Sequence, residues 1–265
     1  MVSRDKGQSS LFVGSTEKAF QVLEAFNGPN RHMSLADIAR TADLDRSATQ
    51  RLVYTLEKLG YLHRIPETTL YGLSSKVLQL SYNYLRANDL IDKASPYLLD
   101  ISRRLGETTN LLVLDGYEIV FLARFPGRHL VNVAFAVGKR LPALFTASGT
   151  AILTRFSENE RAEILRATPL NPMTPFTEVD PDKLYERIRL MADKGYAIVV
   201  NETVLGDISV AAPITDHRGT AVAAINISVP TTRYSAASAE AKLAPHVLVA
   251  AASISESKFA NYNAK

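Results

Sequence analysis

A run of polar side chains between Arg46 and Tyr54 has the composition of a surface that contacts nucleic acid. Arginine can pair with a guanine edge and glutamine with adenine, and hydroxyl groups and arginine also bind phosphate oxygens. The simpler alternative is the solvated polar face of an ordinary helix. The candidates for DNA contact in this run are Arg46, Ser47, Thr49, Gln50, Arg51 and Tyr54.

Two short helices separated by a turn are predicted around this run. Ser34, itself a candidate DNA contact, is placed to cap a helix over residues 35–42, with Asp37 three positions on. Asp45 is placed to cap a second helix that ends before Gly60. Spacings of three and four predict its buried face, formed by Ala48, Leu52, Leu56 and Leu59. The polar run would then lie on the second helix of a helix-turn-helix, which enters the major groove of DNA.

A two-stranded wing is predicted directly after these helices. Residues 61–64 and 70–73 alternate as short strands, and the loop between them places Arg64 and Thr68 where they can contact the phosphate backbone. Between Arg46 and Arg64 the sequence has four cationic residues and only one anionic residue. We therefore expect residues 15–73 to form a winged helix-turn-helix DNA-binding domain. It would follow a flexible segment, 1–14, and open on a helix over 16–26 capped by Ser15.

Composition agrees with a soluble two-domain protein. The chain has 265 residues, of which 46% are apolar and 22% charged, and a net charge of +3 permits a nucleic-acid partner without requiring one. The absence of cysteine excludes disulfides, thiolate metal sites and a cysteine nucleophile. No apolar run of membrane-spanning length and no secretion leader is recognisable, so we expect a cytoplasmic protein without a membrane partner.

The remaining chain predicts a connecting helix and a second domain. Residues 74–88 are expected to form a linker helix that can also pair with a second copy. Residues 89–265 alternate between helical and strand patterns, which predicts an α+β fold. The helices are expected at 91–105, 146–156, 158–166, 180–194 and 236–258, and the strands at 109–114, 119–125, 131–137, 197–200, 208–214 and 221–229.

Several short motifs, in order and spacing, resemble the IclR family of bacterial transcriptional regulators over about residues 12–260. They are Thr16-Glu17-Lys18-Ala19, Leu56-Glu57-Lys58-Leu59-Gly60-Tyr61-Leu62, Gly138-Lys139-Arg140-Leu141-Pro142-Ala143, Lys194-Gly195-Tyr196, and Ala211-Ala212-Pro213-Ile214 followed by Ala223-Ala224-Ile225-Asn226-Ile227-Ser228. The resemblance implies an N-terminal winged helix-turn-helix, a connecting helix and a C-terminal GAF-like domain. In the family that domain binds a small organic effector and helps build dimers or tetramers.

The resemblance also suggests which residues would line an effector pocket. On the last strand the family commonly has two small hydroxyl residues, and here Asn226 departs from that pattern while Ser228 keeps it. Val199 stands where relatives can carry an acidic residue. The expected lining residues are Leu141, Phe145, Thr146, Ser148, Ser209, Asn226 and Ser228.

Residues 129–142 resemble the branch of the family that senses aromatic acids, so the expected effector is an organic acid, preferably aromatic. Arg140 and Arg124 are the candidate counter-charges. The alternative is that Arg140 lies on the surface and the polar strand residues only satisfy strand ends.

The sequence supports two other classes of function less well than a sensor-regulator. An enzyme with an appended DNA-binding domain lacks support, because the five histidines are scattered and no phosphate loop or nucleophile elbow is present. An architectural DNA-binding protein would not need the large second domain. The sequence therefore predicts no cofactor and no metal, and as partners operator DNA, an acid effector, a homodimer or homotetramer, and RNA polymerase as a further candidate.

Overall fold

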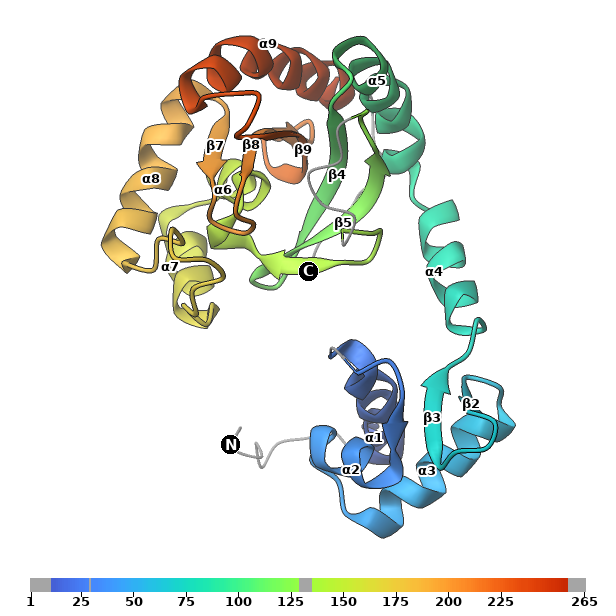
Figure 1. Cartoon of the computed structure of the whole chain (residues 1–265). Helices are drawn as coiled ribbons and strands as arrows, with labels where there is room; N and C mark the ends of the chain where they lie inside the picture. Colours follow the sequence, from blue (N-terminus) through green and yellow to red (C-terminus); the bar gives the residue numbers. More distant parts are fainter. Residues whose placement is uncertain (1–10, 29, 129–134, 257–265) are drawn as a thin grey trace. The chain divides into compact units, whose positions relative to one another are not determined.

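The computed structural model describes residues 11–28, 30–128 and 135–256. The chain divides into two compact units, and the boundary along the sequence falls between Tyr84 and Leu85. Figure 1 shows both units. The segment expected to be flexible, 1–14, therefore lies outside the described residues except for its last four positions.

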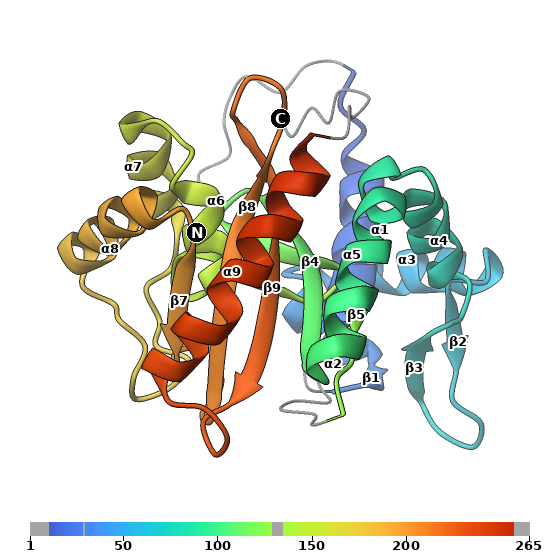
Figure 2. The ribbon, with the colours of Figure 1, turned by 90° about the horizontal axis from the view of Figure 1, so that it is seen from above.

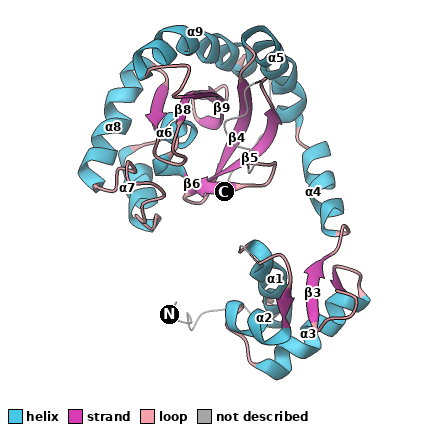
Figure 3. Ribbon diagram, in the orientation of Figure 1, coloured by secondary structure: helices cyan, strands magenta, loops and turns pink. Residues whose placement is uncertain are grey.

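The first unit is a small helical domain with a three-stranded sheet. Its elements are α1 (Gly14–Glu24), η1 (Ala25–Asn27), β1 (Met33–Ser34), α2 (Leu35–Thr41), α3 (Arg46–Lys58), β2 (Leu62–Arg64) and β3 (Leu70–Leu73). The strands are antiparallel in the order β1-β3-β2 (Figure 3). Helices α2 and α3 with the β2–β3 hairpin form the predicted winged helix-turn-helix.

Local chemistry explains the helix boundaries in this unit. Ser34 caps α2 in a capping box with Asp37, and the Asp45 side chain accepts from the backbone amide of Ala48 at the start of α3. Gly60 follows α3 with φ of 80°. The prediction for α1 was wrong: it begins at Gly14, and Ser15 lies inside its first turn rather than at its cap.

The core of this unit is formed mainly by Val22, Ile38, Val53, Leu56 and Leu62. It shows that α3 is rotated relative to the prediction. Thr49, Val53 and Leu56 are its buried residues, whereas Leu59, expected inside, is 53% exposed.

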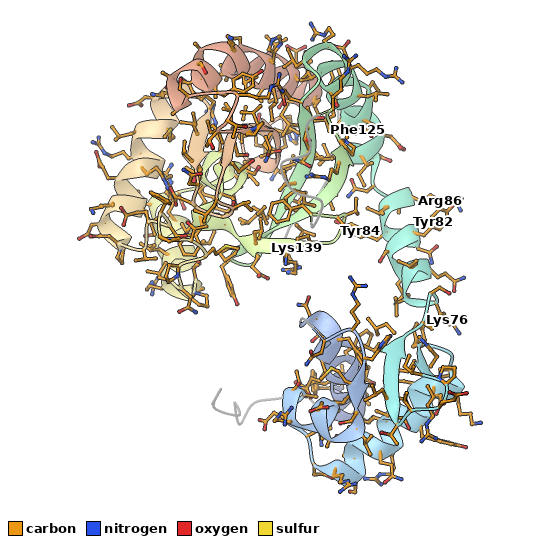
Figure 4. The ribbon with its side chains drawn as sticks, in the orientation of Figure 1. Lys76, Tyr82, Tyr84, Arg86, Phe125 and Lys139 are labelled. Carbon is orange, nitrogen blue, oxygen red and sulfur yellow. The ribbon has the colours of Figure 1, made fainter. Side chains whose placement is uncertain are left out.

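Helix α4 (Val77–Arg86) spans the junction between the units and has no buried residue. Leu78, Leu80, Tyr82 and Tyr84 are all exposed on it. Tyr82 and Arg86 project from one side of the helix and Tyr84 from the other (Figure 4).

The second unit is an α+β domain built on one antiparallel sheet. Its elements are α5 (Asp89–Leu105), β4 (Thr108–Asp115), β5 (Glu118–Phe125), β6 (Arg140–Pro142), η2 (Ala143–Phe145), α6 (Ala147–Leu153), α7 (Glu158–Ala167), α8 (Pro181–Lys194), β7 (Ala197–Val200), β8 (Asp207–Thr215), β9 (Ala221–Pro230) and α9 (Ala236–Ser255). The strand order is β6-β5-β4-β9-β8-β7.

Alternation along the strands sorts side chains onto the two faces of this sheet. Helices α5 and α9 cover one face, where Leu111, Val210 and Ile227 belong to the largest core cluster. Helix α6 lies within the curl of the other face (Figures 1 and 2). Asn110, Ser209 and Asn226 alternate with these core residues, so they point to the α6 side.

Two element predictions need correction. The helix expected over 146–156 is shorter, because η2 precedes it and α6 covers only Ala147–Leu153. The strand expected over 131–137 lies outside the described residues up to 134, and residues 135–137 are not a strand. The described partner of β5 on that edge is β6, which is not among the expected strands.

Candidate functional site

Helix α3 presents most of the predicted DNA contacts on one exposed face. Arg46, Gln50 and Tyr54 follow one another at intervals of four, so they lie along one line of the helix surface. Arg51 is exposed beside them, and Tyr54 is 60% exposed with Lys58 Nζ 5.4 Å from its ring centroid. The face therefore combines guanidinium, amide, phenol and ammonium groups that can contact bases and phosphates.

Thr49 does not belong to this face. Its side chain is fully buried, and its hydroxyl donates to the carbonyl oxygen of Asp45 at 2.9 Å. The prediction that Thr49 contacts DNA is therefore wrong, because the rotation of α3 about its axis points the Thr49 side chain into the core. Ser34 and Ser47 also have local partners, Asp37 and Asp45 respectively, and their roles as DNA contacts stay predictions.

The wing carries exposed Arg64 at the end of β2 and exposed Thr68 in the turn. The Thr68 hydroxyl donates to the Ile65 carbonyl at 2.9 Å and accepts from the Leu70 amide at 3.1 Å. Thr68 therefore shapes the turn, and Arg64 is the group on this hairpin whose charge can reach a phosphate.

A small cavity lies between the α6 face of the sheet and the segments that cover it. Its volume is about 20 Å³, enough for about one water molecule, so a ring-sized ligand requires its walls to move apart. Its lining is of mixed polarity. The apolar lining residues are Leu112, Ile119, Phe121, Phe135, Leu141, Ala147 and Val199, and the polar ones are Thr146, Ser148, Asn201, Glu202, Thr203, Asp207, Ser209, Asn226 and Ser228.

A row of hydrogen bonds crosses the sheet and ends at polar side chains that line the cavity. Arg124 Nη1 donates to Asn110 Oδ1 at 3.1 Å, and Asn110 Nδ2 donates to Asn226 Oδ1 at 2.6 Å. Asn226 Nδ2 then donates to Ser209 Oγ at 2.9 Å, and Ser209 Oγ lies 3.4 Å from Ser228 Oγ. Arg124, Asn110 and Asn226 sit opposite one another on β5, β4 and β9, so strand register aligns them.

Helix α6 contributes a hydroxyl without a partner. Ser148 is fully buried in the cavity wall, and its Oγ has no hydrogen-bond partner among the described residues. The next residue must be glycine, because a Cβ at Gly149 would lie 2.1 Å from the carbonyl oxygen of Ala143. A buried unpaired hydroxyl costs free energy, which a ligand acceptor would relieve.

Two carboxyl groups, those of Asp207 and Glu202, line the cavity. Burial raises the pKa of Asp207 to about 7, against the opposing charge of Arg124. Burial also raises the pKa of Glu202, against its ion pair with Arg187, whose guanidinium also donates to the Leu144 carbonyl. A sequence signal for Asp207 existed: it lies two residues before Ser209 on one strand, so both face the same side.

Six of the seven expected lining residues lie along this cavity: Leu141, Thr146, Ser148, Ser209, Asn226 and Ser228. Whether they bind an effector stays a prediction. Arg140 and Phe145 do not line it. Arg140 pairs with Asp115 at 2.8 Å and Glu118 at 2.7 Å, and Phe145 is fully buried in a separate cluster with Leu184 and Ile188.

A second depression is larger, but it is a weaker candidate for a ligand site. It has a volume of about 450 Å³, lies open between the end of α5 and the segment after β5, and includes Arg103, Arg128 and Ser102. The Ser102 hydroxyl faces the Phe125 and Pro126 carbonyls.

The described residues include no cluster of three or more metal-ligating side chains and no helix able to span a membrane.

Comparison with known proteins places both units in one family. Residues 15–66 match the IclR helix-turn-helix domain, and residues 82–256 match the C-terminal domain of the bacterial transcriptional regulator IclR. The chain belongs to the IclR family. It is therefore a ligand-responsive transcriptional regulator with a DNA-binding and an effector-binding domain, and not an enzyme.

Two relatives and two solved structures illustrate the likeness. The chain is 34% identical over 240 residues to the Pca regulon regulatory protein of Pseudomonas putida, covering 90% of this chain and 82% of the relative. It is 31% identical to the regulator XynR of Escherichia coli over 83% of this chain and 88% of the relative.

Among solved structures, the putative regulator RHA06195 from Rhodococcus sp. RHA1 is 32% identical with a TM-score of 0.78, covering 92% and 98% of the two chains. An IclR homologue from Microbacterium hydrocarbonoxydans, complexed with 4-hydroxybenzoate, is 26% identical with a TM-score of 0.75 over 91% and 98%.

Proposed function

We propose that this IclR-family regulator senses a small aromatic carboxylic acid in the cavity beside α6 and thereby controls genes for the breakdown of such compounds. The cavity supports this proposal with one observation above the rest: the buried Ser148 hydroxyl has no partner among the described residues and lines a space that both apolar and polar side chains enclose. A planar ring suits Phe121, Leu112 and Leu141, and a carboxylate suits the hydroxyl groups of the same cavity.

The names of two similar proteins agree with an aromatic acid. One relative is called the Pca regulon regulatory protein, and one similar structure is complexed with 4-hydroxybenzoate. The polar lining also argues for a ligand-dependent regulator over an architectural DNA-binding protein, since a domain without a ligand gains nothing from an unpaired hydroxyl in a cavity.

Operator binding would use two copies of the chain in a homodimer or homotetramer, acting in the cytoplasm where RNA polymerase is available. Gln50 and Arg51, with Arg46, would choose the sequence in the major groove, and Arg64 would hold a phosphate. The exposed apolar side chains of α4 would pair the copies. Effector binding would expand the cavity and change the spacing of the two α3 helices, a coupling of about 1–3 kcal/mol.

A matched pair of α6 variants tests the cavity assignment. Ser148 and Thr150 are both buried, and both hydroxyls lack a partner among the described residues, but only Ser148 lines the cavity. We expect Ser148→Ala to weaken binding of 4-hydroxybenzoate, or the tightest acid of a panel, about fivefold to tenfold by isothermal titration calorimetry, whereas Thr150→Ala leaves it unchanged. Equal effects of the two variants would place the effector elsewhere.

A further inference from the structure

The direction of the hydrogen-bond row across the sheet is fixed at one end. A guanidinium group has donors and no acceptor, so Arg124 can only donate to Asn110. The oxygen of the Asn110 amide must therefore face Arg124, and its nitrogen must face Asn226. By the same reasoning the Asn226 oxygen faces Asn110, and its nitrogen donates to Ser209.

Without Arg124, the opposite direction of hydrogen bonding would satisfy Asn110, Asn226 and Ser209 equally well. With each amide turned over, Ser209 would donate to Asn226, Asn226 would donate to Asn110, and the serine would offer only lone pairs to the cavity. In the direction that Arg124 imposes, Ser209 Oγ accepts from Asn226, so its own proton is free for Ser228, 3.4 Å away, or for a ligand.

We propose that Arg124, acting through Asn110 and Asn226, makes the serine pair a hydrogen-bond donor and so selects ligands that present an anionic oxygen to Ser209 and Ser228. Arg124 and Asn110 do not line the cavity; Asn226, Ser209 and Ser228 do. Arg124 is thus a positioning residue, and the row gives the cavity its preference for a carboxylate over a neutral group of the same shape.

Burial makes this control effective. Asn110 is 1% exposed and Asn226 7%, so neither amide can exchange its partner for bulk water without leaving a buried polar group unpaired. Successive hydrogen bonds also polarise one another, which strengthens the donor at the end of the row. Asn226 links Asn110 on β4 to Ser209 on β8 and so transmits the direction of the hydrogen bonds.

The test compares acids with their amides, because the two differ little in shape. The inference about the hydrogen-bond row rests on the proposed effector function. Full-length protein is titrated calorimetrically with three pairs: 4-hydroxybenzoate and 4-hydroxybenzamide, benzoate and benzamide, and butyrate and butyramide. The readout is the ratio of the amide dissociation constant to that of the acid. We expect the wild-type protein to favour at least one acid by tenfold or more.

Asn110→Leu breaks the row without changing any charge, and Arg124→Lys keeps a group that can only donate. We expect the ratio to fall about tenfold in Asn110→Leu, the loss of about one hydrogen bond, and to stay within about threefold in Arg124→Lys. Asn110→Val, which favours a strand, serves if the leucine variant does not fold. Arg140→Ala, outside the cavity, is the control and should keep the wild-type ratio.

The outcomes separate the two proposals. An unchanged ratio of amide to acid dissociation constants in folded Asn110→Leu or Asn110→Val would contradict the proposed role of the hydrogen-bond row. It would not contradict the proposed effector function, since charge acting through space would then explain the preference for the acid. Failure of the wild-type protein to bind any acid, with DNA binding intact, would overturn the proposed effector and the row together.

Discussion

Lys76 Nζ donates a hydrogen bond of 2.7 Å to the carbonyl oxygen of Leu59, and its ammonium lies 5.0 Å from the ring centroid of Tyr61. The Ser74 hydroxyl donates in the same way to the Gly60 carbonyl. The approach to α4, where Figure 4 labels Lys76, is thus tied to the C-terminal end of α3. A movement of α4 would therefore be passed to the helix that carries the predicted base contacts.

Lys76→Ala should weaken communication between the units without disabling either. Removing the tie should shrink the effector-induced change in operator affinity by about 0.5–1.5 kcal/mol, because one hydrogen bond and a cation–π contact are lost. The measurement is fluorescence anisotropy of labelled operator DNA with and without effector. Lys183→Ala, which removes an exposed lysine on α8, should behave as wild type. An undiminished effector response in Lys76→Ala would contradict this role.

Gln50→Ala and Arg51→Ala should each cost about 1–3 kcal/mol per half-site on the preferred operator and little on unrelated DNA, if these side chains read bases. Arg64→Ala should instead weaken binding to all sequences and reduce the salt slope by about one, as expected for a phosphate contact. Titrations at several salt concentrations on specific and scrambled duplexes separate the two patterns. Equal losses on both duplexes for Arg51→Ala would make it a phosphate contact as well.

Much of the first unit could be predicted because its signals are local. Capping residues Ser34 and Asp45 and the glycine after α3 mark helix ends through backbone hydrogen bonds close in sequence. The rotation of α3 could not be predicted in the same way. Leu59 was expected to be buried and is exposed, whereas Thr49 was expected to be exposed and is buried. Packing against α1 and β2, which are distant in sequence, decides which side of the helix is buried.

The cavity shows the same division between local and distant information. The family resemblance places Ser209 and Ser228 at the pocket, and they line the cavity from directly paired positions on β8 and β9. Arg140 was misplaced because β6 is only three residues long, and its pairing beside Glu118 has no local pattern. Phe145 was misplaced because the 3-10 turn before α6 directs it away from the cavity toward α8.

Asp207→Asn should change how stability depends on pH. Because the folded pKa of Asp207 is raised from 3.8 to about 7, the folded protein holds a proton that the unfolded chain has lost between these values. Its contribution to the free energy of unfolding therefore falls as pH rises from about 4 to about 7. The asparagine variant should exceed wild type by about 4 kcal/mol at pH 8 and match it near pH 4.

Urea unfolding of both proteins across this pH range checks the expectation. Asp100→Asn, which alters an exposed carboxylate on α5, should show no comparable pH-dependent difference. A stability difference between Asp207→Asn and wild type that is the same at pH 5 and pH 8 would show that Asp207 has an ordinary pKa.

Arg187→Met should strongly destabilise the second unit. Arg187 and Glu202 form an ion pair in which the side chains are only 15% and 11% exposed, so removal of the cation leaves a largely buried carboxylate without its partner. A loss of about 3–5 kcal/mol is expected. Adding Glu202→Gln should restore part of it, because the neutral amide is less costly to bury. A double variant no more stable than Arg187→Met would argue against the pair as the cause.

The central claim is that a small acid bound beside α6 changes the affinity of the winged domain for its operator. The most direct test is a gel shift at stated salt on the DNA immediately upstream of the protein's own gene, with and without a panel of aromatic and aliphatic carboxylic acids. We predict a retarded complex whose midpoint shifts about fivefold or more with at least one aromatic acid, and that Ser148→Ala reduces this shift. A complex that no acid alters would contradict the claim.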